Sequence, residues 1–168
     1  MFIYRKVILI LLLLPATCIV HAQAVNIDSL QFIIKFNQDN AEKVNAYKVL
    51  SQALLFKNFD SCQATSLAVS LLAQKLKDDA ALSELKKITG LSWYFKGVYD
   101  SAAAYYYKAL DIAKNVKDPS KKAAILNELG KLYRKTKDLD RALQMYNEAY
   151  VIYEKMQDEA NMATILNE

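Results

Sequence analysis

Apolar and small side chains recur every three or four residues along most of the chain, which is the spacing of one face of an α-helix. Leu126, Leu129 and Tyr133 form one such stripe, and Ala142 and Tyr146 belong to the next. Three glycines and two prolines in 168 residues leave too few turn residues for an all-β fold. The pattern therefore predicts an all-α chain, with helices at 28–37, 41–57, 60–77, 80–96, 99–116, 120–136 and 139–156.

Carboxylates mark where several of these helices begin. Asp118 followed by Pro119 is typical of an N-cap with proline at the first helical position, and Asp78 and Asp158 are expected to cap in the same way. Three further aspartates are expected in the first turn of a helix, where they interact favourably with the helix dipole: Asp60, Asp100 and Asp140.

The first helix is short and amphipathic. Asp28 is its expected N-cap, and its apolar stripe consists of Leu30, Ile33, Ile34 and Phe36. We expect this helix to pack as a lid on the helices that follow.

The same residue types return at a shift of 40 positions. Aspartates align at 60, 100 and 140, and small residues align as Cys62, Ala102 and Ala142. The last six residues, 163–168, match residues 123–128 at five positions. One helix pair cannot bury its apolar face alone, so this period predicts similar hairpins stacked in a row.

These motifs resemble the helix-turn-helix unit of the tetratricopeptide repeat family. In the third unit the matching residues are Leu126, Leu129, Gly130, Tyr133, Ala142, Tyr146 and Ala149, and in the second they are Gly90, Trp93, Ala102, Tyr106 and Ala109. The resemblance implies a right-handed superhelical array of antiparallel helix hairpins, an α-solenoid. It implies units at about 41–79, 80–118 and 119–158, the start of a fourth at 159–168, and a capping helix within 23–40.

Two departures from the family pattern stand out. The period of 40 exceeds the usual 34 residues, and Leu50 stands where the second and third units have Gly90 and Gly130. Glycine inside a helix is less favourable than alanine by roughly 1 kcal/mol. We therefore expect close approach of another helix at each glycine, with Ala102 and Ala142 facing them across the hairpin. Tyr106 and Tyr146 are expected to fill the space between units.

Residues 1–22 have the pattern of a secretory signal peptide, with Arg5 and Lys6 before an apolar stretch at 7–14 and a cleavage site after Ala22. Cleavage after Ala24 is the second candidate. The mature segment is thus expected to be exported to the periplasm. An uncleaved membrane anchor and a lipid anchor at Cys18 are the alternatives. Cleavage would lower the net charge from +4 to +2, would remove the single histidine, and would leave Cys62 as the remaining cysteine.

Catalytic and metal-binding patterns are missing from the expected mature segment. Without histidine it has no Ser-His-Asp or Cys-His arrangement. Cys62 occupies the slot of Ala102 and Ala142, which favours a buried structural thiol over a nucleophile. The acids are dispersed, and no Gly-rich phosphate loop occurs. We therefore expect no enzymatic activity and no cofactor or metal.

Basic residues gather in two places, at 114–122 and at 131–137, but acids such as Asp111, Asp118 and Glu128 interrupt them. A solvated face explains them better than nucleic-acid binding. Tyr105, Tyr106 and Tyr107 point to different sides of a helix and so make no base-stacking platform.

The family resemblance implies a candidate peptide groove on the inner side of the superhelix. Counting Gly130 as position eight, the inward positions two, five, nine and twelve hold Tyr47, Leu54, Glu84, Lys87, Leu91, Tyr94, Asn127, Lys131 and Arg134, together with Val44, Ser51 and Ala124; Asn167 repeats Asn127. In similar repeats an inward asparagine hydrogen-bonds the backbone of an extended peptide, and lysine or arginine meets its carboxylates. The alternative is that these are ordinary exposed polar residues.

The leader, the short helix and the 40-residue units together resemble the exported N-terminal half of bacterial membrane-anchored regulators. Our first hypothesis is a non-catalytic scaffold that binds a protein or peptide. The alternatives are the sensor portion of a membrane-bound histidine kinase or transcription regulator, of which this sequence would be a fragment, and an assembly or chaperone-like adaptor. We expect no nucleic acid as partner, and no membrane unless a span follows downstream.

Overall fold

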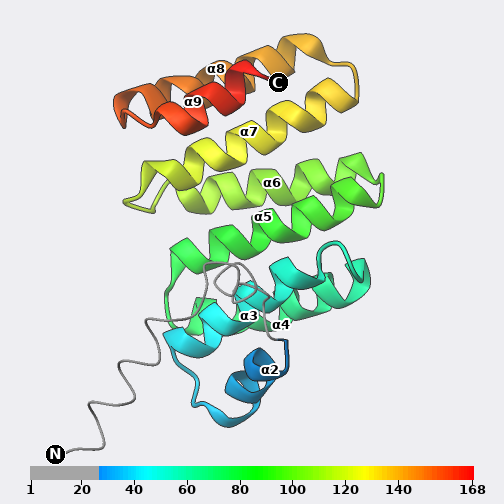
Figure 1. The fold of residues 1–168 in the computed structure, drawn as a ribbon, viewed down its shortest axis with the longest axis vertical. Coiled ribbons are helices and arrows are strands. Elements are labelled where there is room, and N and C mark those ends of the chain that lie inside the picture. The colour runs from blue at the N-terminus through cyan, green and yellow to red at the C-terminus, as the bar shows by residue number, and fades with distance from the viewer. Residues whose placement is uncertain (1–26) are drawn as a thin grey trace, which may run out of the picture.

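The computed structural model describes residues 27–168, which form eight α-helices and no strand. The helices are α2 (Ile27–Phe36), α3 (Ala41–Leu54), α4 (Phe59–Lys75), α5 (Asp79–Phe95), α6 (Tyr99–Ala113), α7 (Pro119–Lys135), α8 (Leu139–Lys155) and α9 (Glu159–Leu166). They stack as successive antiparallel hairpins along one axis (Figure 1). The all-α prediction is confirmed, and the predicted helix ends differ from the observed ones by at most three residues.

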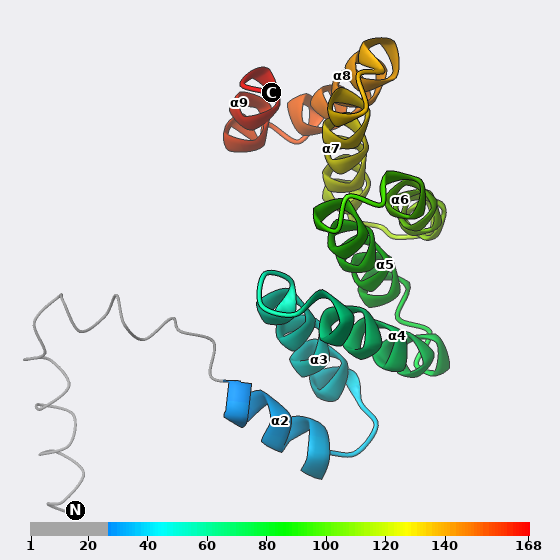
Figure 2. The same cartoon turned by 90° about the vertical axis from the view of Figure 1, so that its right-hand side faces the viewer.

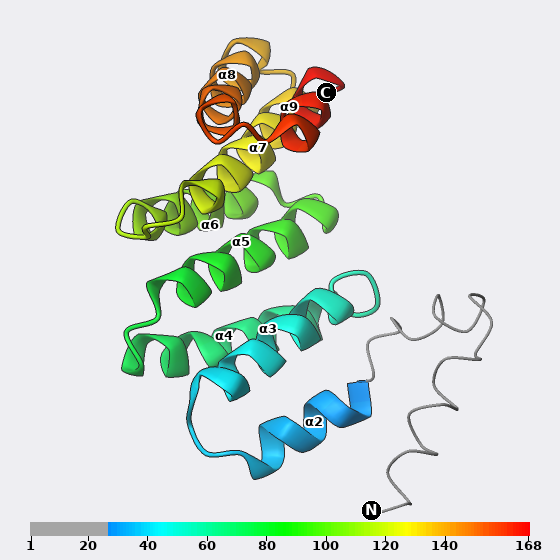
Figure 3. The ribbon, with the colours of Figure 1, turned by 60° about the vertical axis from the view of Figure 1, so that its left-hand side comes forward.

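The stack is curved, so it has an inner and an outer side. Figure 2 shows α3, α5, α7 and α9 along the inner side of the curve, with α4, α6 and α8 outside. Figure 3 shows the same hairpins from another direction, with α5 crossing the middle of the stack. Contacts of α3 with α5 and of α5 with α7 join neighbouring hairpins on the inner side.

Short turns with one left-handed residue reverse the chain between helices. Lys137 has φ +65° and Gly97 has φ +79° at equivalent places, while Lys77 and Gln157 fill the same role after α4 and α8. The aspartate that follows Lys137 forms hydrogen bonds to both neighbouring helices. The Asp138 amide donates to the Tyr133 carbonyl at 2.9 Å, and its carboxylate accepts from the Arg141 amide at 3.1 Å. One aspartate therefore closes α7 and caps α8.

The predicted N-caps at Asp78, Asp118 and Asp158 are confirmed by their side-chain hydrogen bonds to the following turn. The prediction for Asp28 is wrong, because α2 already begins at Ile27 and Asp28 lies in its first turn. Three caps were not predicted: Asn40, Asn58 and Asp138. Helix α6 has Val98 at this position and no side-chain cap.

Each glycine of the second and third units lies under a tyrosine ring. A Cβ at Gly90 would come within 2.6 Å of the Tyr106 ring and 3.3 Å of the Ala102 carbonyl oxygen, and a Cβ at Gly130 would come within 2.5 Å of the Tyr146 ring. Close approach at the glycines thus occurs as expected. We predicted that the rings fill the space between units. Each ring lies against the glycine of its own hairpin, and both rings belong to one buried core cluster with residues of α6, α7 and α8.

The first hairpin reverses this size relationship. At the positions equivalent to Gly90 and Tyr106 it has Leu50 on α3 and Ser66 on α4, and both are buried. The large side chain therefore comes from the first helix of the pair instead of the second. Leucine with serine and glycine with tyrosine have a similar total volume, so either combination can fill one inter-helix layer at native density.

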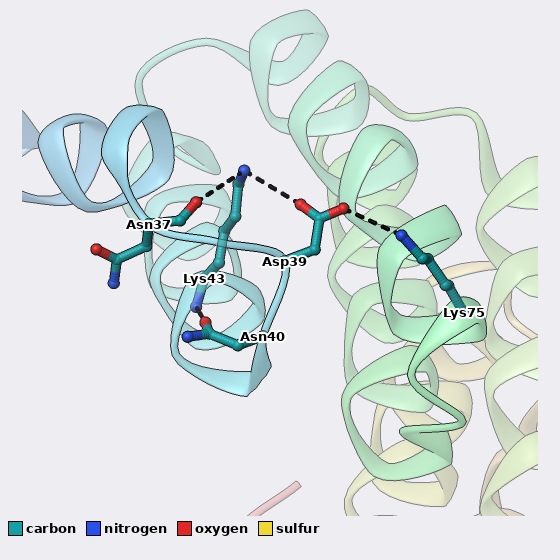
Figure 4. A network of polar contacts seen from close by, with 5 residues as sticks. All are labelled: Asn37, Asp39, Asn40, Lys43 and Lys75. Atoms are coloured by element: carbon teal, nitrogen blue, oxygen red, sulfur yellow. Dashed lines mark hydrogen bonds and ion pairs between the residues drawn. The ribbon is translucent and has the colours of Figure 1, made fainter.

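Helix α2 packs on α3, as expected of a lid, although none of its residues is fully buried. The following loop is held by Asp39, whose carboxylate lies 3.3 Å from the Lys43 ammonium and 3.4 Å from the Lys75 ammonium (Figure 4). Lys43 also donates to the Asn37 carbonyl at 3.3 Å. The assignment of Phe36 to the apolar stripe is wrong, because its side chain is 62% exposed and its ring lies 4.6 Å from that of Phe32.

Candidate functional site

The inner side of the stack carries a basic hollow between α5 and α7. Its volume is about 340 Å³, and it is lined by Tyr94, Lys131, Arg134, Lys135 and Lys137. The first three were predicted to face the groove. Lys135 and Lys137 were interpreted as part of a solvated face, because the family's inward positions do not include them. Four cations therefore surround one aromatic side chain.

A carboxylate of the chain itself occupies part of this basic site. One Glu168 side-chain oxygen lies 2.6 Å from the Arg134 guanidinium, and the other lies 3.6 Å from the Lys131 ammonium. Lys131 also lies 3.3 Å from the Glu128 carboxylate. Arg134 remains about half exposed and retains unused N–H donors. The geometry shows that this lysine and arginine can receive one carboxylate together.

Tyr94 lines the basic hollow, and Asn127 lies one helical turn before Lys131 on α7. The Asn127 Oδ1 atom is buried and has no hydrogen-bond partner among the described residues. Such a group is unfavourable when buried alone. The Tyr94 phenol can donate a hydrogen bond, and burial raises its pKa further above the ordinary value of 10. The Tyr94 ring lies 5.8 Å from that of Tyr99.

The remaining predicted groove residues do not join this hollow. Glu84 and Lys87 form an ion pair at 3.0 Å, with Gln52 donating to Glu84 at 3.4 Å, so their charges are already matched. Tyr47 lines a separate hollow beside α4. Three others are placed differently: Leu54 and Leu91 pack against buried clusters, and Asn167 is the exposed C-cap of α9.

The groove positions assigned to Val44 and Ser51 are wrong, because these residues are 1% and 0% exposed. Val44 belongs to a buried cluster with Leu82 and Leu85 of α5, and the Ser51 hydroxyl donates to the Tyr47 carbonyl at 2.9 Å. Small uncharged side chains at these positions allow α3 to pack directly on α5. The repeat position that exposes Lys131 in the third unit therefore does not expose Ser51 in the first unit.

Within residues 27–168, no cluster of three or more histidine, cysteine, aspartate or glutamate side chains could hold a metal ion. Cys62 is free and fully buried, and burial raises the pKa of its thiol, which disfavours the nucleophilic thiolate. No helix in the described part of the chain is both long and apolar enough to cross a membrane. The predicted signal peptide at 1–22 lies outside the described residues.

Comparisons with known proteins found one family model and a similar solved structure. Residues 94–155 match the family model of the tetratricopeptide repeat. The crystal structure of BtubC (BKLC) from P. vanneervenii is similar over 83% of this chain and 58% of that chain, with a TM-score of 0.68 and 21% identity. The chain thus spans little more than half the length of that protein, and the likeness concerns the fold alone. No curated protein matches the sequence.

Tetratricopeptide repeats generally mediate protein–protein interactions and are typically non-catalytic scaffolds. The family match covers the second hairpin in part and the third in full, which are the hairpins with the glycine and tyrosine pairs. The helical repeat fold continues through the first hairpin and into α9. Residues 94–155 therefore match the tetratricopeptide repeat, and residues 27–168 fold as an all-α solenoid of helix hairpins.

Proposed function

We propose that the basic hollow between α5 and α7 binds an extended acidic segment of a partner protein and that the chain acts as a non-catalytic scaffold. The single observation that carries this proposal is the position of the Glu168 carboxylate between Arg134 and Lys131. A ligand carboxylate would take the same place. Because arginine binds carboxylates through a planar fork of donors, this contact also orients the ligand.

The neighbouring groups suit the rest of such a segment. The Asn127 side-chain amide can bond to a peptide backbone, which would satisfy its buried oxygen through an N–H donor. The Tyr94 ring offers an apolar surface with a polar end at the same hollow. Lys135 and Lys137 add positive charge at the rim, which accelerates encounter with an acidic partner more than it tightens the complex.

The test is a fluorescence anisotropy titration with a labelled glutamate-rich peptide and its glutamine-substituted counterpart. We expect binding of the glutamate peptide only. Lys131→Glu with Arg134→Glu should weaken it by roughly tenfold or more, because the change removes two cations and adds two repelling carboxylates. Unchanged helical circular dichroism would show that the fold is retained.

The matched control is Lys117→Glu with Lys121→Glu, which changes the net charge equally. Lys121 lies about 15 Å along α7 from Lys131, at 1.5 Å per residue. This control should lower affinity at most slightly, and the small loss should vanish as salt screens it. Equal loss in both double variants would refute a localised site and indicate a general charge effect.

We also propose that the scaffold works outside the cytoplasm, on the basis of the leader pattern at residues 1–22. Expression in a Gram-negative host, followed by fractionation and N-terminal sequencing, tests this. We expect a periplasmic product beginning at Gln23. An unprocessed chain that starts at Met1 and stays in the cytoplasm would contradict export.

A further inference from the structure

The outer face of α4 is apolar and exposed from Ala64 to Leu71. Leu67 and Leu71 are 61% and 67% exposed, and Ala64 and Ala68 are exposed on the same face. No charged residue occurs between Asp60 and Lys75. Four apolar residues at this i, i+3, i+4, i+7 spacing are the stripe with which a helix packs on another helix.

The equivalent positions on the other outer helices are mostly polar. In α6 they hold Ala104, Tyr107, Lys108 and Asp111, and in α8 they hold Gln144, Asn147, Glu148 and Val151. All eight are exposed. Charges therefore keep the outer faces of α6 and α8 in water, whereas α4 leaves a patch of the kind that marks an interaction site. The repeat itself does not require leucine at these places.

We propose that the outer face of α4 binds the same face of a second copy of this chain, with the two α4 helices antiparallel. A twofold axis between Leu67 and Ala68 places Leu67 opposite Ala68 of the other copy, and Leu71 opposite Ala64. Each leucine thus meets an alanine, in both directions. Such alternation of large and small side chains lets two helices approach closely. The pattern is also self-complementary, as a twofold interface requires.

Charge supports the same antiparallel register. The twofold axis that pairs leucine with alanine also sets Asp60 of one copy opposite Lys75 of the other, at both ends of the stripe. These side chains are 84% and 70% exposed. Each has one partner within its own chain, Lys96 for Asp60 and Asp39 for Lys75. A second carboxylate oxygen and further ammonium protons remain available for the other copy. A parallel arrangement would set like charges together.

Two hollows flank the stripe and give the other helix room for its side chains. One, of about 240 Å³, is lined by Leu67 together with Lys86, Trp93 and Tyr105. The other, of about 320 Å³, is lined by Leu71 and Ala68 together with Tyr47. The contact involves one helix per copy, so the area that it buries is expected to be below the roughly 1,200 Å² of a standard interface. We therefore expect reversible association at about 10–1,000 µM.

The first test is sedimentation equilibrium of the purified protein over this concentration range. The wild-type chain should show a monomer–dimer equilibrium, and Leu67→Glu with Leu71→Glu should weaken it at least tenfold. The matched control, Asn147→Glu with Val151→Glu on α8, introduces the same residues at equivalent exposed positions and should leave the equilibrium unchanged. All changed side chains are exposed, and circular dichroism checks the fold.

The second test addresses the register through charge. Asp60→Lys alone should weaken the dimer, because lysine then faces Lys75 at both ends. Asp60→Lys with Lys75→Asp reverses both charges and should restore the wild-type dissociation constant. Restoration of the dissociation constant would be specific to an antiparallel pairing of these two residues. If each residue had only a structural role within its own chain, the affinity losses from the two substitutions would add.

Several outcomes overturn the proposal. A wild-type chain that stays monomeric up to about 1 mM has no such interface at the affinity expected of a one-helix contact. A dimer that survives the two glutamates on α4 uses another surface. A monomer whose α4 leucines instead mediate binding to lipid vesicles or to a different protein would assign the face to that occupant.

Discussion

The first and third hairpins bury the same two positions with side chains of opposite size. The third sets the Tyr146 ring of α8 over Gly130 of α7, while the first places Leu50 on α3 and Ser66 on α4. Both hairpins keep the antiparallel arrangement of the stack. The 40-residue period therefore preserves a volume shared between two helices, whereas the residue at either position can change if its partner changes with it.

The two hairpins also differ in where they meet solvent. The third has a mostly polar outer face on α8 and a basic hollow at its inner helix α7. The first has an apolar outer face on α4, and its inner positions Val44 and Ser51 are buried. One scaffold thereby has two different surfaces, a basic inner one and an apolar outer one.

The largest expected effect comes from removing the large side chain that the first hairpin carries on its first helix, Leu50. Leu50→Gly deletes a buried leucine and weakens a helix, so it should lower the free energy of unfolding by about 4 kcal/mol, measured by urea denaturation. Gln52→Gly on the exposed side of the same helix is the control and should cost about 1 kcal/mol. Equal losses would mean that Leu50 fills no space of its own.

A smaller effect should follow from supplying the cap that α6 lacks. Asn58 and Asp138 cap α4 and α8 through their side chains, but Val98 does not cap α6. Val98→Asp should therefore raise the free energy of unfolding by about 1 kcal/mol, and Asp138→Ala should lower it by a similar amount. If Val98→Asp destabilises the protein, the equivalence of these turns does not hold.

The smallest expected effect is a pH dependence of stability that comes from Asp138, in the turn between α7 and α8. The Asp138 carboxylate accepts hydrogen bonds from the Arg141 side chain and, with a smaller effect, from the Arg141 backbone amide. Both hydrogen bonds lower the pKa of Asp138 below its ordinary value of 3.8. Its stabilising effect is therefore present above about pH 4 and is lost as pH falls through the lowered pKa.

Asp138→Asn keeps the cap acceptor and cannot ionise, so its stability should fall less than that of the wild type between about pH 4 and pH 2. Thermal unfolding followed at a series of pH values measures this. Parallel curves for the two proteins would contradict the assigned role of the Asp138 carboxylate.

Local signals explain how much of the fold was predictable. Helix periodicity and caps such as Asp118 depend on residues close in sequence, and they gave helix ends within three residues of the structure. The exchange of Leu50 and Ser66 was not predicted, because the departure at Leu50 was considered without its partner on the next helix. The burial of Val44 depends on how closely α3 approaches α5, which one repeat pattern does not specify.

The candidate site was predictable in part for the same reason. Lys131 and Arg134 follow from the family's inward positions, and the structure places them in one hollow with Tyr94. The carboxylate that reaches them belongs to Glu168, 34 residues beyond Arg134, and a contact across hairpins has no local sequence signal. Lys135 and Lys137 were set aside as solvated residues, although they line the same hollow.

The most direct test of the account is a double-mutant cycle that converts the second hairpin to the arrangement of the first. Gly90→Leu should lower the free energy of unfolding by about 3 kcal/mol through overpacking, and Tyr106→Ser by about 4 kcal/mol through cavity formation. The double variant should be at least as stable as either single variant, because leucine then fills the space that the ring has left. Losses that simply add would contradict a volume shared between the two positions.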